Sequence, residues 1–231
     1  MLTLENLELR QDGFALTADI TLENRDIVAV IGPSGAGKST LLNIVAGFTS
    51  PDAGRVIWDG VDITANRPAK RPIAMLFQDN NLFGHLTVAQ NVALGVRPDM
   101  RLNSAQKDRV ERALKRVGLA DMGARKPAQL SGGQQSRVAL ARVLVQRKPL
   151  MLLDEPFAAL GPALRNEMLD LVAELAGEIG ATVLLVSHDP MDARRIAKRT
   201  ILVAQGMAYP PQDTGALLDN PPEALAAYLG T

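Results

Sequence analysis

The stretch VIGPSGAGKSTLL, from Val30 to Leu42, decides the fold of this protein. It reads as the end of an apolar strand, a glycine-rich turn and the start of a helix, with the spacing G-x-x-x-x-G-K-[ST]. Glycines let the backbone curl around an anion, and the helix adds the positive end of its dipole. A flexible glycine turn is the weaker interpretation, because strand and helix flank it. We predict a nucleoside triphosphate loop made of Gly32, Pro33, Ser34, Gly35, Ala36, Gly37, Lys38, Ser39 and Thr40.

Two acidic residues follow a buried strand farther along the chain. Leu150 to Leu153 are apolar, and Asp154 and Glu155 come directly after them. Open α/β sheets bind ligands at the carboxyl ends of their strands, so both acids should project toward the phosphates. Asp154 then suits the role of holding Mg²⁺ together with Ser39. Glu155 suits the role of general base for the attacking water. An ordinary acidic strand end is the alternative for both.

Two further polar residues stand at the ends of apolar runs. Gln78 ends the run PIAMLF, where a glutamine can touch the metal or the lytic water, although most such glutamines are only polar strand ends. His188 follows TVLLVS and could donate a hydrogen bond to the γ-phosphate. A lone histidine is more often a packing residue, but this position favours the phosphate role. His85 is expected to be structural or on the surface.

The string LSGGQ, residues 130–134, is a second candidate for binding phosphate. Ser131 is a natural N-cap, and Gly132 and Gly133 leave bare backbone N–H groups at the start of a helical run from Gln135 to Gln146. The alternative is a simple helix cap. Either both helix ends bind one nucleotide, or each serves a nucleotide shared with another subunit, which would require a symmetric dimer.

Composition limits the class of protein. The 231 residues carry 25 Lys and Arg against 25 Asp and Glu, so bulk charge does not favour nucleic-acid binding. Cys is absent, so the chain has no disulfide framework and no thiolate metal site. The beginning MLTLENLELR does not read as a signal peptide, and no apolar stretch approaches the roughly 20 residues that span a bilayer. We expect a cytosolic chain whose membrane role, if any, requires a partner.

Hydrophobic patterns predict an α/β fold. Alternation from Phe14 to Leu22 and a hairpin around Asp59-Gly60 indicate antiparallel strands. Apolar runs near residues 27, 72, 149, 182 and 200 indicate a parallel sheet covered by helices, which we expect over 38–45, 104–117 and 162–179. We predict one domain over 1–231. It should combine a P-loop NTPase (RecA-like) core, an antiparallel β lobe and an α-helical insertion at about 79–139.

In this order, GPSGAGKST, Gln78, LSGGQ, LLDE and His188 resemble the ATP-binding subunits of ATP-binding-cassette (ABC) transporters, over nearly the whole chain. The resemblance implies a head-to-tail homodimer that closes on two Mg·ATP and reopens after hydrolysis. It implies that Ser39 and Gln78 meet Mg²⁺, and that Glu155 is the general base and His188 the γ-phosphate sensor. Residues acting on the opposite copy's ATP would be Ser131, Gly133 and Gln134.

The same resemblance implies partners. A transmembrane permease would dock its coupling helix on the segment from Asp79 to Asn91, and a periplasmic solute-binding protein would act through that permease, at the cytoplasmic face of a bacterial inner membrane. RPIAMLFQDNNLFGHLTVAQNVALG and the compact ending are similar to the ATPases of importers for thiamine or thiamine pyrophosphate. Sulfate, iron and polyamine importers have relatives of every motif. A non-transport ABC ATPase and a weakly catalytic regulatory subunit are further alternatives.

Three departures from the family pattern stand out. Gly161 occupies the position of a usual Asp, which leads to the hypothesis that it lowers the ATPase rate or loosens coupling between sites. Gln135 and Ser136 replace the usual Arg or Lys and Gln after the LSGGQ string. The usual adenine-stacking aromatic residue has Phe14 as its nearest candidate, and a core position for Phe14 is equally compatible with the sequence.

Overall fold

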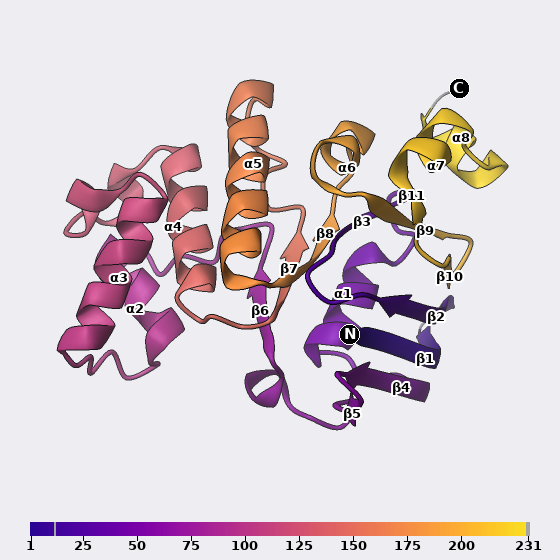
Figure 1. Ribbon diagram of the computed structural model, residues 1–231, viewed down its shortest axis with the longest axis horizontal. Helices are drawn as coiled ribbons and strands as arrows, with labels where there is room; N and C mark the ends of the chain where they lie inside the picture. Colours follow the sequence, from indigo (N-terminus) through magenta and orange to yellow (C-terminus); the bar gives the residue numbers. More distant parts are fainter. Residues whose placement is uncertain (12, 230–231) are drawn as a thin grey trace.

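One continuous sheet runs through the computed structural model, which describes residues 1–11 and 13–229 (Figure 1). Its strand order is β5-β4-β1-β2-β10-β9-β3-β8-β7-β6, and β11 pairs with β9. The strands are β1 (Leu2–Gln11), β2 (Phe14–Leu22), β3 (Ile27–Ile31), β4 (Ala53–Trp58), β5 (Val61–Asp62), β6 (Ile73–Leu76), β7 (Leu150–Asp154), β8 (Thr182–Val186), β9 (Arg199–Ala204), β10 (Met207–Ala208) and β11 (Gln212–Asp213).

Antiparallel pairing builds the β lobe. β1 lies between β2 and β4, and β4 pairs with β5 at the edge of the sheet. Buried and exposed residues alternate along β2, as the sequence predicts, because one face packs on the core and the other faces solvent. Asp59 and Gly60, with φ of 47° and 80°, turn the chain between β4 and β5, which is the backbone geometry of the predicted hairpin.

Parallel pairing builds the other half of the sheet. β6, β7, β8, β3 and β9 run parallel to one another in that order. Leu152 and Leu184 pack on the side of α1 (Lys38–Ala46), whereas Met151 and Val183 pack on the side of α5 (Pro162–Ile179). Both faces are therefore covered, which explains why these strands read as continuous apolar runs. The carboxyl ends of β3, β7 and β8 meet at one edge.

The helices α2 (Val88–Val96), α3 (Ser104–Arg116) and α4 (Gly132–Leu144) lie between β6 and β7 in the chain and gather at the end of the molecule opposite the β lobe (Figure 1). Three corrections to the sequence predictions belong here. α4 begins at Gly132, not Gln135, because Ser131 caps it. α3 ends at Arg116, with Val117 as its C-cap. Gln78 lies two residues beyond the end of β6 and does not terminate the strand.

Short helices complete the fold. α6 (Pro190–Ile196), α7 (Thr214–Asp219) and α8 (Glu223–Leu229) follow the parallel strands, and 3-10 turns occur at Pro68–Lys70, Ala120–Met122 and Pro127–Gln129. Leu225 of α8 is fully buried against the same apolar cluster as Ile31 and Leu202, so the last described helix is packed on the sheet. Within the described ranges, none of the helices has the length and hydropathy that a bilayer crossing demands.

Candidate nucleotide-binding site

The predicted phosphate loop connects β3 to α1, at the edge where strands β3, β7 and β8 end. Gly32 has φ of 148°, and a Cβ atom there would lie 2.0 Å from the Val203 carbonyl oxygen. Gly37 has φ of 105°, and a Cβ atom there would lie 2.6 Å from the ring of Phe14. Backbone angle and close approach both require glycine at these two positions, which keeps the loop narrow enough for N–H groups to line an anion site.

Lys38 lies across this loop. Its ammonium group donates to the carbonyl oxygens of Gly32 at 2.8 Å and Pro33 at 2.9 Å, and the residue is only 7% exposed. Burial lowers the pKa of Lys38 from 10.5, and the charges of Glu155 and Asp154 partly oppose that shift. The ammonium group of Lys38 thus lies at the N-terminus of α1, where backbone N–H groups also favour an anion.

Ser39 and Asp154 meet from different elements. The Ser39 hydroxyl, in the first turn of α1, donates to Asp154 Oδ1 at 2.9 Å, at the end of β7. Burial raises the pKa of Asp154 from 3.8, while the hydrogen bond from Ser39 lowers it. These are hard oxygen ligands of the type that Mg²⁺ prefers, and Mg²⁺ at phosphate sites uses one or two protein oxygens. The described residues contain no group of three or more His, Cys, Asp or Glu that could hold a metal ion.

Glu155 and His188 face each other across the strand ends. His188 Nδ1 lies 3.3 Å from Glu155 Oε2, and the His188 side chain is 47% exposed. Glu155 has φ of 45°, a conformation that costs free energy for a residue with a long side chain. Its N–H donates to the Val186 carbonyl at 3.1 Å, which holds this backbone in place. Strain of this kind is most often retained at functional sites.

Lys38, Ser39, Glu155 and His188 line one cavity of about 400 Å³, whereas Asp154 is not among its lining residues. It is lined by Phe14, Ser34, Gly35, Gly37, Lys38, Ser39, Thr40, Glu155, His188 and Tyr228. The Phe14 ring packs on the core of the β lobe and also forms part of the cavity wall. Its position is therefore compatible with both predicted roles, a core residue and an adenine-stacking residue. Gln78 is exposed and is not part of the cavity wall.

Tyr228 is the lining residue that sequence reasoning missed. It comes from α8, and its hydroxyl donates to the backbone carbonyl of His188. Burial raises the pKa of Tyr228 above 10.0, and the charges of Glu155 and Asp189 add to the shift. No local pattern marks this tyrosine, because its place in the site depends on how α8 packs against the sheet.

The LSGGQ string lies apart from this cavity, at the N-terminus of α4 in the helical region (Figure 1). Ser131 Oγ accepts a hydrogen bond from the Gln134 N–H at 3.3 Å, and the Gln134 side chain accepts one from the Ser131 N–H at 3.0 Å. A Cβ atom at Gly133 would lie 2.3 Å from Leu164 of α5. Within one chain, therefore, these residues form a capping box and a close helix–helix contact.

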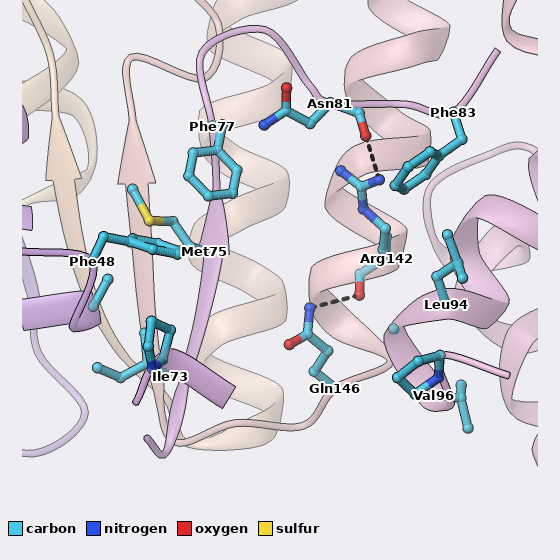
Figure 2. A pocket seen from close by; sticks show the side chains of 14 residues that line it. Phe48, Ile73, Met75, Phe77, Asn81, Phe83, Leu94, Val96, Arg142 and Gln146 are labelled. Atoms are coloured by element: carbon cyan, nitrogen blue, oxygen red, sulfur yellow. Dashed lines mark hydrogen bonds between the residues drawn. The ribbon is translucent and has the colours of Figure 1, made fainter. Parts of the chain in front are cut away.

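A second cavity, a groove of about 500 Å³, separates the sheet from the helical region (Figure 2). Figure 2 shows Phe48, Met75 and Phe77 on one side and Phe83, Leu94 and Val96 on the other. Between them lie Arg142 of α4 and Gln146, two residues beyond the end of that helix. Phe48 and Phe83 are 56% and 49% exposed. The buried side chain of Asn91 holds the segment before it by accepting from the Phe83 N–H at 2.8 Å and donating to the Thr87 carbonyl at 3.0 Å.

Fold and cavity together define a P-loop nucleoside triphosphatase. Comparison with known proteins narrows the class, since the sequence model of the ABC transporter family matches residues 17–158. Two dimeric structures of the ABC transporter cassette MJ0796 cover 93% of this chain and 99% of their own, with 30% identity and TM-scores of 0.81 and 0.80. The second is a post-hydrolysis state bound to ADP and Pi. The chain belongs to the ABC transporter family, and the predicted ABC ATPase fold class is confirmed.

Relatives that match over the full length of the chain fall within a narrower group of ABC proteins. The chain is 61% identical over 230 residues to the thiamine import ATP-binding protein ThiQ of Ruegeria sp. (strain TM1040), covering 100% of both sequences. It is 48% identical over 230 residues to ThiQ of Shigella boydii serotype 4 (strain Sb227), covering 100% of this chain and 99% of the relative. The predicted resemblance to the ATPases of thiamine importers is therefore confirmed.

Proposed function

We propose that this chain is the ATPase subunit of an importer for thiamine or thiamine pyrophosphate. It acts as a homodimer bound to a permease at the cytoplasmic face of a bacterial inner membrane, and a periplasmic solute-binding protein supplies the permease. The observation that carries this proposal is the 61% and 48% identity, along the whole chain, to relatives named as thiamine import ATP-binding proteins. The cavity around Lys38 supplies the matching chemistry. Nucleic acid has no part in this function.

The residues in and next to the cavity divide the chemistry in this proposal. The loop N–H groups and Lys38 bind the phosphates of ATP, while Ser39 and Asp154 hold Mg²⁺, with Gln78 approaching from its exposed loop. Bound Mg²⁺ neutralises charge on the phosphate oxygens. Glu155 takes a proton from the attacking water, and His188 donates to the γ-phosphate oxygens. His188 Nδ1 lies 3.3 Å from Glu155 Oε2, so both side chains are close enough to contact the same γ-phosphate and attacking water. This proximity supports the two roles.

Turnover of ATP tests the role of Glu155. Glu155→Gln keeps the shape of the side chain and removes the base, so kcat should fall by about 10²–10⁴ while the Kd for ATP stays within about threefold. Glu174→Gln changes an exposed carboxylate of α5 outside the cavity and serves as the control. Equal turnover in wild type and Glu155→Gln would remove Glu155 from the mechanism.

Pairing of two copies follows from the position of the LSGGQ string. Ser131, Gly133 and Gln134 lie outside the cavity of their own chain, and a two-fold axis would bring the α4 N-terminus of each copy to the nucleotide of the other. The hydrolysis-deficient Glu155→Gln protein should therefore dimerise with ATP, as measured by light scattering. A strictly monomeric ATP-loaded protein, even with its permease present, would contradict this arrangement.

The groove in Figure 2 is the proposed docking site for a helix of the permease. Its exposed Phe48 and Phe83 offer apolar anchors, and the segment bearing Phe83 follows Gln78, the residue proposed to approach Mg²⁺. Phe83→Ser should abolish co-purification with the permease and leave ATP binding unchanged. Val61→Ser, at an exposed apolar residue on β5, is the matched control. Retained co-purification of Phe83→Ser would exclude the groove.

Solute uptake tests the substrate. Cells lacking this chain should regain uptake of radiolabelled thiamine when wild type is restored, but not with Glu155→Gln. Parallel assays with sulfate, iron and a polyamine separate the alternatives. Restored uptake of one of these solutes in place of thiamine would overturn the substrate assignment and keep the transport ATPase.

A further inference from the structure

Arg165, in the first turns of α5, binds three polar side chains of the segment that carries His188. Its guanidinium donates to Asp192 at 2.8 Å and 3.0 Å, to Asp189 at 3.1 Å and to Ser187 at 3.5 Å. Ser187 and Asp189 are the residues on either side of His188. The side chains of Arg165 and Asp192 are only 13% and 8% exposed, so this ion pair is buried between α5 and α6.

The cluster is closed by its own hydrogen bonds. Ser187 Oγ donates to Asp192 Oδ2 at 2.5 Å and accepts from the Asp189 N–H at 3.0 Å. The Ser187 N–H donates to the Val30 carbonyl at 3.2 Å, which joins the cluster to the strand leading into the phosphate loop. A planar guanidinium that bonds to two carboxylates at once fixes both in direction as well as distance, which a lysine cannot do.

His188 itself is held weakly. Its ring is 47% exposed, and its bond to Glu155 at 3.3 Å is long. The position of the ring therefore depends on the backbone at residues 187–189, which Arg165 holds from one side and the hydroxyl of Tyr228 from the other. Arg165 also belongs to α5, which begins at Pro162 shortly after Glu155, and its N–H donates to the carbonyl of the N-cap Gly161 at 2.9 Å.

We infer that Arg165 is a positioning residue for ATP hydrolysis, which sets the distance between His188 and Glu155 by joining α5 to the loop after β8. This inference rests on the proposed function, because it assumes that His188 and Glu155 act on the same ATP. A purely structural role would be to join α5 to α6. A second ion pair, Arg195 with Asp170 at 2.6 Å and 2.8 Å, already joins these helices on the surface and does not touch the His188 loop.

The test is a double-mutant cycle in the full-length protein. Arg165→Met should lower kcat by roughly 10- to 100-fold, since a misplacement of about 1 Å costs up to that much, and should leave the Kd for ATP within about threefold. In a His188→Ala background the same substitution should change kcat by less than about twofold, because the residue through which it acts is gone. Arg195→Met, the surface counterpart, should keep kcat within about twofold of wild type.

Asp189→Asn keeps the inference testable if Arg165→Met does not fold. In the wild type, Asp189 Oδ1 caps α6 by accepting a hydrogen bond from the Met191 N–H at 2.9 Å. Asparagine can still accept this bond, but it removes the charge that Arg165 binds. It should reduce kcat several-fold in wild type and not in His188→Ala. Equal losses in both backgrounds, or equal kcat for Arg165→Met and Arg195→Met, would overturn the inference. If Glu155→Gln and His188→Ala both turned over ATP at the wild-type rate, the proposed roles of Glu155 and His188, on which this inference rests, would fail.

Discussion

Gly161 offers a prediction whose size follows from the structure. It is the N-cap of α5 with φ of −64° and ψ of 156°, and it has no side chain to accept a hydrogen bond from the first turn. Pro162 has no N–H, so the N–H groups of Ala163 and Leu164 are the first ones that a cap could satisfy. A Cβ atom at Gly161 would meet nothing within 4 Å. Neither backbone conformation nor packing requires glycine here.

Gly161→Asp should therefore stabilise the protein. Replacing glycine restricts the unfolded chain, which raises the free energy of unfolding by about 0.4–1 kcal/mol. Aspartate is also a better N-cap than glycine, by a few tenths of a kcal/mol. The sum is about 1 kcal/mol, which corresponds to roughly 2–4 °C in Tm for a domain of this size. Gly161→Ala is the matched control, because it restricts the unfolded chain equally but caps poorly. Its free energy of unfolding should be about 1 kcal/mol below that of the aspartate variant, and its Tm should be lower accordingly.

The assay is thermal unfolding of the nucleotide-free protein, followed by circular dichroism, together with steady-state ATP turnover. A Tm for Gly161→Asp at or below that of Gly161→Ala would refute the reasoning about the cap. Turnover tests a separate hypothesis, that glycine at this position slows hydrolysis. Gly161→Asp should raise kcat, and an unchanged kcat would count against that hypothesis.

Three further substitutions test individual contacts. Phe14→Ala should weaken ATP binding by about 1–3 kcal/mol if the ring stacks on adenine, as measured by titration calorimetry, whereas an unfolded variant would favour a core role alone. Tyr228→Phe removes the bond to the His188 carbonyl and should lower the free energy of unfolding by about 0.5–1.5 kcal/mol in denaturant titrations; an unchanged value would show that this bond contributes nothing. Hydrogen bonds from the Thr64 hydroxyl and N–H hold the pKa of Asp62 in the folded protein below 3.8. These bonds therefore stabilise the folded protein fully above pH 3.8, and their contribution is lost as the pH falls through the pKa of folded Asp62. Asp62→Asn should thus lower Tm near pH 7, and the difference from wild type should shrink as the pH falls below 3.8; a pH-independent difference would contradict this.

Much of the site could be predicted from sequence because its signals are local. Glycines with positive φ, the cap at Ser131 and the acids after the apolar run at 150–153 depend on backbone angles and on neighbours within a few residues. The strand and helix patterns likewise depend on periodicity, which explains why the α/β architecture follows from the chain. The errors were at ends of elements, such as α4, where capping shifts the boundary by a turn.

Sequence by itself determined which residues are the candidates for binding phosphate, holding a metal or accepting a proton. Tertiary structure alone decided which of them share a cavity and what holds them there. The Phe14 ring lies on Gly37, Tyr228 reaches His188 across 40 residues, and Arg165 reaches Asp192 across 27 residues. The physical reason is that such contacts depend on strand order and helix packing, which bring distant segments together without leaving a local pattern.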